Sequence, residues 1–315
     1  MPGTADIRAV STAEFDAFGP WIDEVRTASA VPRLYRDYPL DLAAARLVLK
    51  VPRNIARRDA LPTMDLYDHL LVVGPHDLTV LSRQDGGYGE FTMGYDRIVA
   101  IQDSVNLLAG RLTVHTRSER AWSIPYNGSS SEVVGTLVRL LRDLALETIP
   151  APASAPGPGS WPPAAAQPPG LGGLEDRDMA LVASCRDLRG DEPAMQLLAA
   201  HARRALVPRG GALTRALHVV RPMTLQGALV FASTHEVQVL HRRDWLVRGN
   251  RPVHSLARTV LLLGRLDAVT VRQDARYAGV SVVTMRAGTT SIDLPVPSGS
   301  AAERALLGAP TVASA

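Results

Sequence analysis

The stretch LLVVGPHDLTVLSR (residues 70–83) has a partner of the same pattern in LVFASTHEVQVLHR (residues 229–242). In each stretch two apolar runs flank a short polar segment, and His76 aligns with His235. Apolar runs separated by a turn-forming segment are typical of a β-hairpin. The chain is therefore predicted to contain two related β-rich units.

The similarity continues in the same order along both halves of the chain. RIVAIQDSVNLLAGRLTVHT (97–116) aligns with RLDAVTVRQDARYAGVSVVTM (265–285) with one inserted residue, and SIPY (123–126) aligns with SIDLPV (291–296). A Ser-x-x-Glu capping box then predicts a helix in each half, beginning at Ser129 and at Ser300. The apolar stripe of the first helix is predicted to be buried: Val134, Leu137, Leu141 and Leu144.

A run of short antiparallel strands followed by one amphipathic helix resembles the bacterial pleckstrin-homology-like domains, here in a tandem arrangement of the actinobacterial type. The resemblance implies an α+β fold of two antiparallel half-open β-barrels, each closed by a C-terminal helix and preceded by short helical segments. Better-known relatives bind phosphoinositides through a long basic loop in the first hairpin. Here the corresponding loops, 74–77 and 233–236, are short and contain no Lys or Arg, which argues against that ligand.

These patterns give a domain map. Residues 1–60 are predicted to be a helical segment, with one helix near residues 14–25 and another near 41–49. The two pleckstrin-homology-like domains are assigned to 61–147 and 213–309, and a helical preamble to 174–212 that includes a helix over 191–206. The charge-free segment 148–173 is rich in Pro, Ala and Gly, a composition that does not form a packed core, so it is predicted to be a disordered linker. Residues 310–315 are predicted to be a disordered tail.

Composition indicates where the protein is located in the cell and what kind of partner it binds. The single cysteine, Cys185, cannot form an internal disulfide, and the N-terminus has no apolar signal region, so a cytoplasmic location is predicted. No run of about 18 apolar residues is present, which argues against a membrane-spanning helix. Residues 1–150 carry a net charge of −3 and residues 171–315 a net charge of +6, so an anionic partner is expected to approach the second half.

The sequence contains no recognisable motif of catalytic, metal-ligating or cofactor-binding residues. The eight histidines have no zinc-ligand spacing, and His76-Asp77 and His235-Glu236 lie where turns are expected. The sequence therefore predicts a non-enzymatic protein with no metal and no cofactor. The leading prediction is a binding or scaffold protein that uses its two modules for protein–protein interaction.

One segment carries the alternative prediction, and residues 242–251 are called the Arg/Trp loop here. Four arginines surround the apolar triplet Trp245–Val247 in this loop. The candidate binding residues are these arginines and the tryptophan: Arg242, Arg243, Trp245, Arg248 and Arg251. Cations around an apolar residue suit an anionic membrane surface, and the protein would then lie peripherally at the inner face of the membrane. Nucleic acid is the less favoured anionic ligand, and the competing interpretation is that Trp245–Val247 form an ordinary strand. The number of copies in the assembly is left open.

Overall fold

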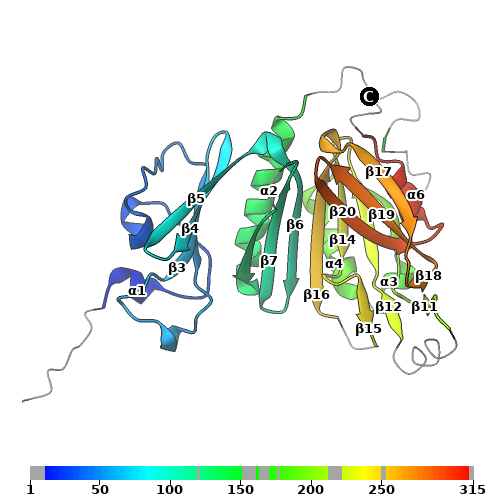
Figure 1. Ribbon diagram of the computed structural model, residues 1–315, viewed down its shortest axis with the longest axis horizontal. Coiled ribbons are helices and arrows are strands. Elements are labelled where there is room, and N and C mark those ends of the chain that lie inside the picture. The colour runs from blue at the N-terminus through cyan, green and yellow to red at the C-terminus, as the bar shows by residue number, and fades with distance from the viewer. Residues whose placement is uncertain are drawn as a thin grey trace, which may run out of the picture. The chain divides into compact units, whose positions relative to one another are not determined.

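The structure is a computed structural model that describes residues 11–118, 121–150, 161–162, 170–175, 178–211, 222–249 and 253–311. The chain divides into two compact units. Unit 1 consists of Met1–Tyr95 and Tyr126–Leu141, and unit 2 of Asp96–Pro125 and Arg142–Ala315. Figure 1 shows the elements of both units and labels most of them with the names used below.

Unit 1 contains one open antiparallel sheet whose strands follow the order of the chain. The strands are β1 (Asp23–Glu24), β2 (Leu47–Pro52), β3 (Tyr67–Val73), β4 (Asp77–Gln84) and β5 (Gly87–Gly94). The predicted hairpin is confirmed, since β3 pairs with β4 and the turn closes with a 2.8 Å bond from the Gly74 amide to the Asp77 carbonyl. A short helix, α1 (Ala13–Ala17), precedes the sheet, and Tyr35, Tyr67 and Leu70 lie in its core.

The helix predicted at Ser129 is α2 (Ser131–Glu147), and its predicted apolar stripe is buried. Val134, Leu137 and Leu141 are fully covered and Leu144 is 3% exposed. Asn127 rather than Ser129 caps the 3-10 turn that leads into the helix, since its side chain accepts a hydrogen bond from the Ser129 amide.

Unit 2 is built on a seven-stranded antiparallel sheet that joins strands from both halves of the chain (Figure 1). Its order is β8 (Trp122–Asn127), β7 (Ala109–Thr116), β6 (Ile98–Asn106), β16 (Ser255–Leu262), β14 (Glu236–His241), β13 (Ala228–Ala232) and β9 (Gln196–His201). The junction is the β6–β16 pair, in which Ile101 lies opposite Val260 and Ala100 opposite Leu261. All four side chains are buried, so the pairing covers two strand edges with apolar contacts.

Both faces of this sheet are covered over β13 and β14. The helix α4 (Met179–Asp191) covers one face with Leu181, Val182 and Cys185, against Leu229 and Phe231. The opposite face, with Val230 and Val239, packs in a core shared with β19 (Val280–Ala287), β20 (Thr290–Pro297) and α6 (Ala301–Leu307). With β17 (Ala268–Gln273), β19 and β20 form a three-stranded sheet in the order β17-β19-β20. Cys185 is thus a core residue, and burial raises the pKa of its thiol.

Two smaller sheets complete the described part of unit 2. The first has the order β10 (Arg204–Ala205), β12 (Met223–Leu225) and β15 (Leu246–Arg248), and the second pairs β11 (Val207–Pro208) with β18 (Tyr277–Ala278). A one-turn helix, α3 (Gly172–Glu175), precedes α4.

The expectation of two half-open barrels, each closed by a C-terminal helix, is wrong. The described residues form five separate sheets, and none of them closes into a barrel. The aligned segments do form matching elements, since 70–83 covers β3–β4 and 229–242 covers β13–β14. However, β6 pairs with β16 of the second half, so the strands of the first half divide between two sheets.

The helix predicted near 14–25 is limited to α1, because Asp23–Glu24 form β1 and pair with β2. Two further predicted helices are wrong, because strand pairing overrides local helical preference. In place of the helix over 41–49, residues 47–52 form β2, which pairs with β3. In place of the helix over 191–206, residues 196–201 form β9, which pairs with β13. Most of the predicted linker 148–173 and of the tail 310–315 lies outside the described residues. Trp161, which is described, packs against the core of unit 2.

Candidate functional site

Arg242, the first predicted binding residue, is buried. It directly follows β14, its side chain is 4% exposed, and Nη2 donates to Oδ1 of Asp178 over 2.9 Å. Its Nη1 donates to the carbonyl oxygen of Ser255 over 2.7 Å. The positive charge of Arg242 is therefore neutralised inside unit 2 and does not face an external ligand.

Trp245, the predicted apolar contact, is half-buried against the protein's own residues. Its ring stacks on that of His241, with centroids 4.2 Å apart and planes at 11°, and it packs against two apolar cores. Burial lowers the pKa of His241 to about 4, so the imidazole is neutral at neutral pH and stacks as an uncharged ring. The competing interpretation of this segment is largely what the structure shows, since Leu246–Arg248 form β15 and pair with β12.

Of the other arginines of the Arg/Trp loop, the structure describes Arg243 and Arg248. Arg248 is exposed at the end of β15, and Arg251 lies outside the described residues. Arg243 is half-exposed, and its Nη1 donates to the carbonyl oxygen of Ala109 over 3.3 Å. That bond places Arg243 beside the hairpin formed by β6 and β7.

The tip of this hairpin consists of two exposed leucines. Asn106 pairs with Ala109, so Leu107 and Leu108 form a two-residue turn, and their exposed fractions are 69% and 67%. Leu107 has φ of +55°, a conformation that favours glycine and costs other residues roughly 1–2 kcal/mol. Hairpin turns of this length normally contain Asn or Gly, which are polar or unstrained there. Folding therefore does not favour a leucine pair at this place.

The aligned turn of the second half shows how the same position is built from polar residues. The counterpart of Asn106 is Asp274, whose Oδ1 accepts hydrogen bonds from the amides of Arg276 and Tyr277 over 2.8 and 2.9 Å. Asp commonly stabilises turns in this way. The leucine pair is thus a feature of the first half alone, and the repeat does not explain it.

Two arginines accompany the leucines. Arg111 is exposed on β7 close to the turn, and Arg243 contacts Ala109 from the Arg/Trp loop. Neither guanidinium forms an ion pair with any residue that the structure describes. We call Leu107, Leu108, Arg111 and Arg243 the Leu–Arg tip. It combines exposed apolar area with uncompensated positive charge, the combination that was predicted for the Arg/Trp loop.

The chain was compared with known proteins. It matches no family model, no curated protein and no solved structure. Among the residues that the structure describes, no helix is long and apolar enough to span a membrane. Within that same part of the chain, no group of three or more His, Cys, Asp and Glu side chains is arranged to hold a metal ion.

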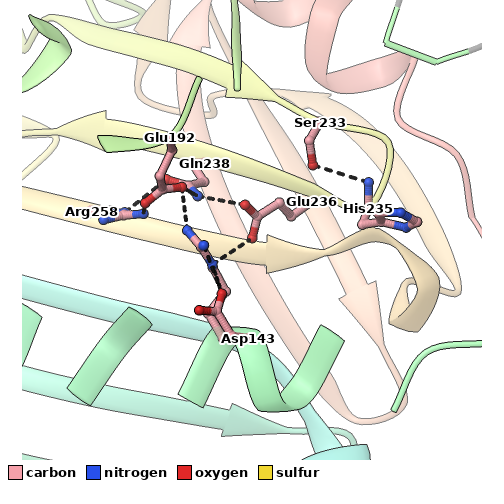
Figure 2. A network of polar contacts seen from close by, with 8 residues as sticks. Asp143, Glu192, Ser233, His235, Glu236, Gln238 and Arg258 are labelled. Carbon is pink, nitrogen blue, oxygen red and sulfur yellow. Dashed lines mark hydrogen bonds and ion pairs between the residues drawn. The ribbon is translucent and has the colours of Figure 1, made fainter. Parts of the chain in front are cut away.

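A second polar cluster lies inside unit 2, between the end of α2 and the large sheet (Figure 2). Glu192, which follows α4, accepts hydrogen bonds from Arg142, from Arg258 over 2.5 Å and from Gln238 over 2.8 Å. Gln238 also donates to Oε1 of Glu236 over 2.8 Å, and its own carbonyl accepts from Arg258 over 2.9 Å. We call these five residues the buried ionic network.

The two glutamates of the buried ionic network have opposite pKa shifts. Burial opposes ionisation of Glu192, but Arg258 and Arg142 outweigh it and hold the pKa of that carboxyl below its usual value. Burial raises the pKa of Glu236, against the weaker opposing effect of Arg142. The Nε of Arg142 is 3.8 Å from Oε2 of Glu236, which has no hydrogen-bond partner, and Arg142 also pairs with Asp143.

Charge balance is consistent with these shifts. Two arginines face Glu192, Glu236 and the neighbouring Asp143, so a protonated Glu236 leaves the network and Asp143 together neutral. Two carboxylates with diverging pKa values are also typical of a general acid and base. Here the contacts of Glu192 are all with Gln238 and the arginines of the network, which fix it within the fold. The network joins α2, β14, β16 and the residue that follows α4.

Sequence reasoning missed the leucines of the Leu–Arg tip. A signal was present: the aligned stretch SVNLLAGR carries Leu-Leu at the place where the second half has Ala275-Arg276 between polar turn residues. Turn residues are normally exposed, so an apolar pair at a turn position in only one copy of the repeat indicates exposed apolar side chains that the shared fold does not require.

Proposed function

We propose that this chain is a non-enzymatic binding protein that attaches peripherally to anionic phospholipid surfaces through the Leu–Arg tip. The observation that carries the proposal is the exposed leucine pair, held in a turn where Leu107 is conformationally unfavourable. Conformational cost at an exposed position is a common sign of function. A projecting apolar turn suits insertion between lipid headgroups better than it suits a small-molecule ligand, which needs a concave site.

The charge of unit 2 supports an anionic surface. Unit 2 contains 23 Lys and Arg against 17 Asp and Glu, a net charge of +6, whereas unit 1 has a net charge of −3. An arginine near an anionic membrane contributes about 1 kcal/mol. Burial of an exposed leucine side chain contributes roughly 1.5–3 kcal/mol. The two arginines and two leucines of the Leu–Arg tip would together give reversible membrane binding, and the arginine contribution would weaken as the salt concentration rises.

The first prediction concerns vesicle binding. In pelleting assays at low salt, the protein is expected to bind phosphatidylserine-containing vesicles and to bind pure phosphatidylcholine vesicles at least tenfold more weakly. Leu107→Ser/Leu108→Ser and Arg111→Gln/Arg243→Gln should each weaken binding at least tenfold, because each removes one of the two contributions. Raising the salt concentration should weaken binding of the wild type, since screening reduces the arginine contribution.

The matched control is Leu61→Ser, because Leu61 is a leucine of unit 1 that is 52% exposed and lies outside the tip. Its binding should equal that of the wild type. The proposal is overturned if the wild type does not bind anionic vesicles, or if the leucine double variant binds them equally well. Single-stranded DNA is tested in parallel, and tighter binding to DNA than to vesicles would replace lipid by nucleic acid as the ligand.

A second prediction separates the functional role of Leu107 from a structural one. Leu107→Gly is expected to raise the free energy of unfolding by about 0.5–1 kcal/mol, because glycine adopts positive φ without the cost that leucine has. The same variant should bind vesicles more weakly. Leu108→Gly is the control: Leu108 does not have positive φ, so glycine there should give no gain in stability. Urea denaturation measures both variants, and a loss of stability in Leu107→Gly would contradict the assignment of strain.

A further inference from the structure

The strand β17 forms an exposed edge of the three-stranded sheet (Figure 1). Its last four residues, Thr270–Gln273, are all exposed, and no other described strand has four consecutive exposed residues. Val271 is 44% exposed, although its cross-strand neighbour Val283 is fully buried. The edge therefore leaves apolar surface uncovered beside the core of unit 2.

The register shows which backbone groups point away from the sheet. The Asp274 amide donates to the Val280 carbonyl over 2.9 Å, which makes these two residues a hydrogen-bonded pair. In an antiparallel ladder such pairs alternate with pairs whose amide and carbonyl groups point outward. The outward groups of β17 thus belong to Val269, Val271 and Gln273. None of them has a backbone hydrogen-bond partner in the described part of the chain.

The usual protections of a sheet edge are weak in β17. Proteins normally guard edges with proline, lysine, a bulge or an inward charge. The strand AVTVRQ contains no proline and no lysine, and its register with β19 runs without a shift over all six residues. Its one charged side chain, Arg272, is paired with Asp293 over 2.8 Å. The edge can accept another strand.

The surroundings of this edge are positively charged. Arg209 reaches the side chain of Gln273 over 3.5 Å, Arg276 follows the strand, and Arg286 lies opposite Ala268 on β19. None of these three arginines has an ion pair with a residue that the structure describes. The nearby carboxylates are already engaged: Arg117 pairs with Asp267, and Arg272 pairs with Asp293. Asp274, which follows the strand, accepts hydrogen bonds from the amides of Arg276 and Tyr277. An added strand next to this edge would be favoured by acidic side chains.

We propose that β17 binds an extended, acidic segment of a partner protein as an added strand. Backbone groups of the segment bond to Val269, Val271 and Gln273, an apolar side chain covers Val271, and acidic side chains lie near Arg209, Arg276 and Arg286. Such strand addition obtains affinity from main-chain hydrogen bonds and specificity from alternate side chains. The site lies on different residues from the Leu–Arg tip, so either proposal can fail without the other.

The test uses the full-length protein and a labelled peptide of alternating glutamate and valine, seven residues long, with a second peptide in which lysine replaces glutamate. Fluorescence anisotropy should show at least tenfold tighter binding of the glutamate peptide. Amide exchange of Val269 and Val271, followed by NMR, should slow when that peptide binds. Equal binding of the two peptides, or unchanged exchange at both amides, would overturn the proposal.

The protein variant is Val271→Pro, because proline removes an outward amide and leaves the bonds from β17 to β19 in place. It should weaken peptide binding at least tenfold, whereas Val271→Thr, which keeps the amide and the shape, should stay within about threefold. If Val271→Pro does not fold, N-methylated peptides replace it. Methylation of one alternate set of peptide amides should abolish binding and methylation of the other should not. Equal effects of the two sets would show that no strand is added.

Discussion

Replacing Arg242 with methionine is expected to lower the free energy of unfolding by about 4 kcal/mol. Removing one partner of a buried ion pair leaves the other charge unpaired in a poor solvent, which costs roughly 3–5 kcal/mol. Arg242 and Asp178 are 4% and 3% exposed, so water does not replace the lost partner. The variant also loses the bond from Arg242 to the Ser255 carbonyl. Urea denaturation monitored by circular dichroism measures the loss.

Arg243→Met is the matched control, because it removes a neighbouring arginine that is half-exposed and has no ion pair with a described residue. It should change the free energy of unfolding by less than about 0.5 kcal/mol. The double variant Asp178→Leu/Arg242→Met should recover most of the loss, since an apolar pair replaces a buried ionic pair with little net cost. A loss below about 1 kcal/mol in Arg242→Met would show that the ion pair is not formed in solution.

This contrast between two adjacent arginines explains why the Arg/Trp loop could be only partly understood from its sequence. Arg242 and Arg243 have the same chemistry and the same local context, but the partner of Arg242 is Asp178, 64 residues away. No local periodicity reports a contact of that range. The pattern of β14, in which all six residues are buried, also gives no alternation from which an inward or outward direction could be assigned.

Local signals, by contrast, predicted local structure well. The apolar–turn–apolar pattern of residues 70–83 gave the β3–β4 hairpin, and the stripe from Val134 to Leu144 is buried as predicted. The β6–β16 pair could not be predicted, because it depends on two apolar edges that are complementary only in three dimensions. The same holds for β2, where an alanine-rich stretch suggests a helix until the pairing with β3 is known.

Two isosteric substitutions in the buried ionic network are expected to have opposite effects at neutral pH. Glu192→Gln should lower the free energy of unfolding by about 3 kcal/mol, because it removes the carboxylate that pairs with two arginines. This is the lower end of the range for a buried pair, since Arg142 and Arg258 are 13% and 21% exposed and regain some water. Glu236→Gln should increase the free energy of unfolding, because an amide resembles the protonated form that burial favours there.

The dependence on pH follows from the directions of the two pKa shifts. The pKa of Glu192 is lowered by folding, so its contribution is present above the ordinary carboxyl pKa of about 4.5 and is lost as the pH falls through the folded value. The loss of unfolding free energy in Glu192→Gln should therefore become smaller as the pH falls below about 4.5. The pKa of Glu236 is raised by folding, so ionisation costs stability as the pH rises above about 4.5, and the gain in Glu236→Gln should appear over that rise. Urea denaturation between pH 3.5 and pH 7.5, values that bracket the ordinary carboxyl pKa, tests both curves. If both variants changed the free energy of unfolding in the same direction, the description of the network would be contradicted. The two glutamates would then share one environment, and the arginines would not distinguish Glu192 from Glu236.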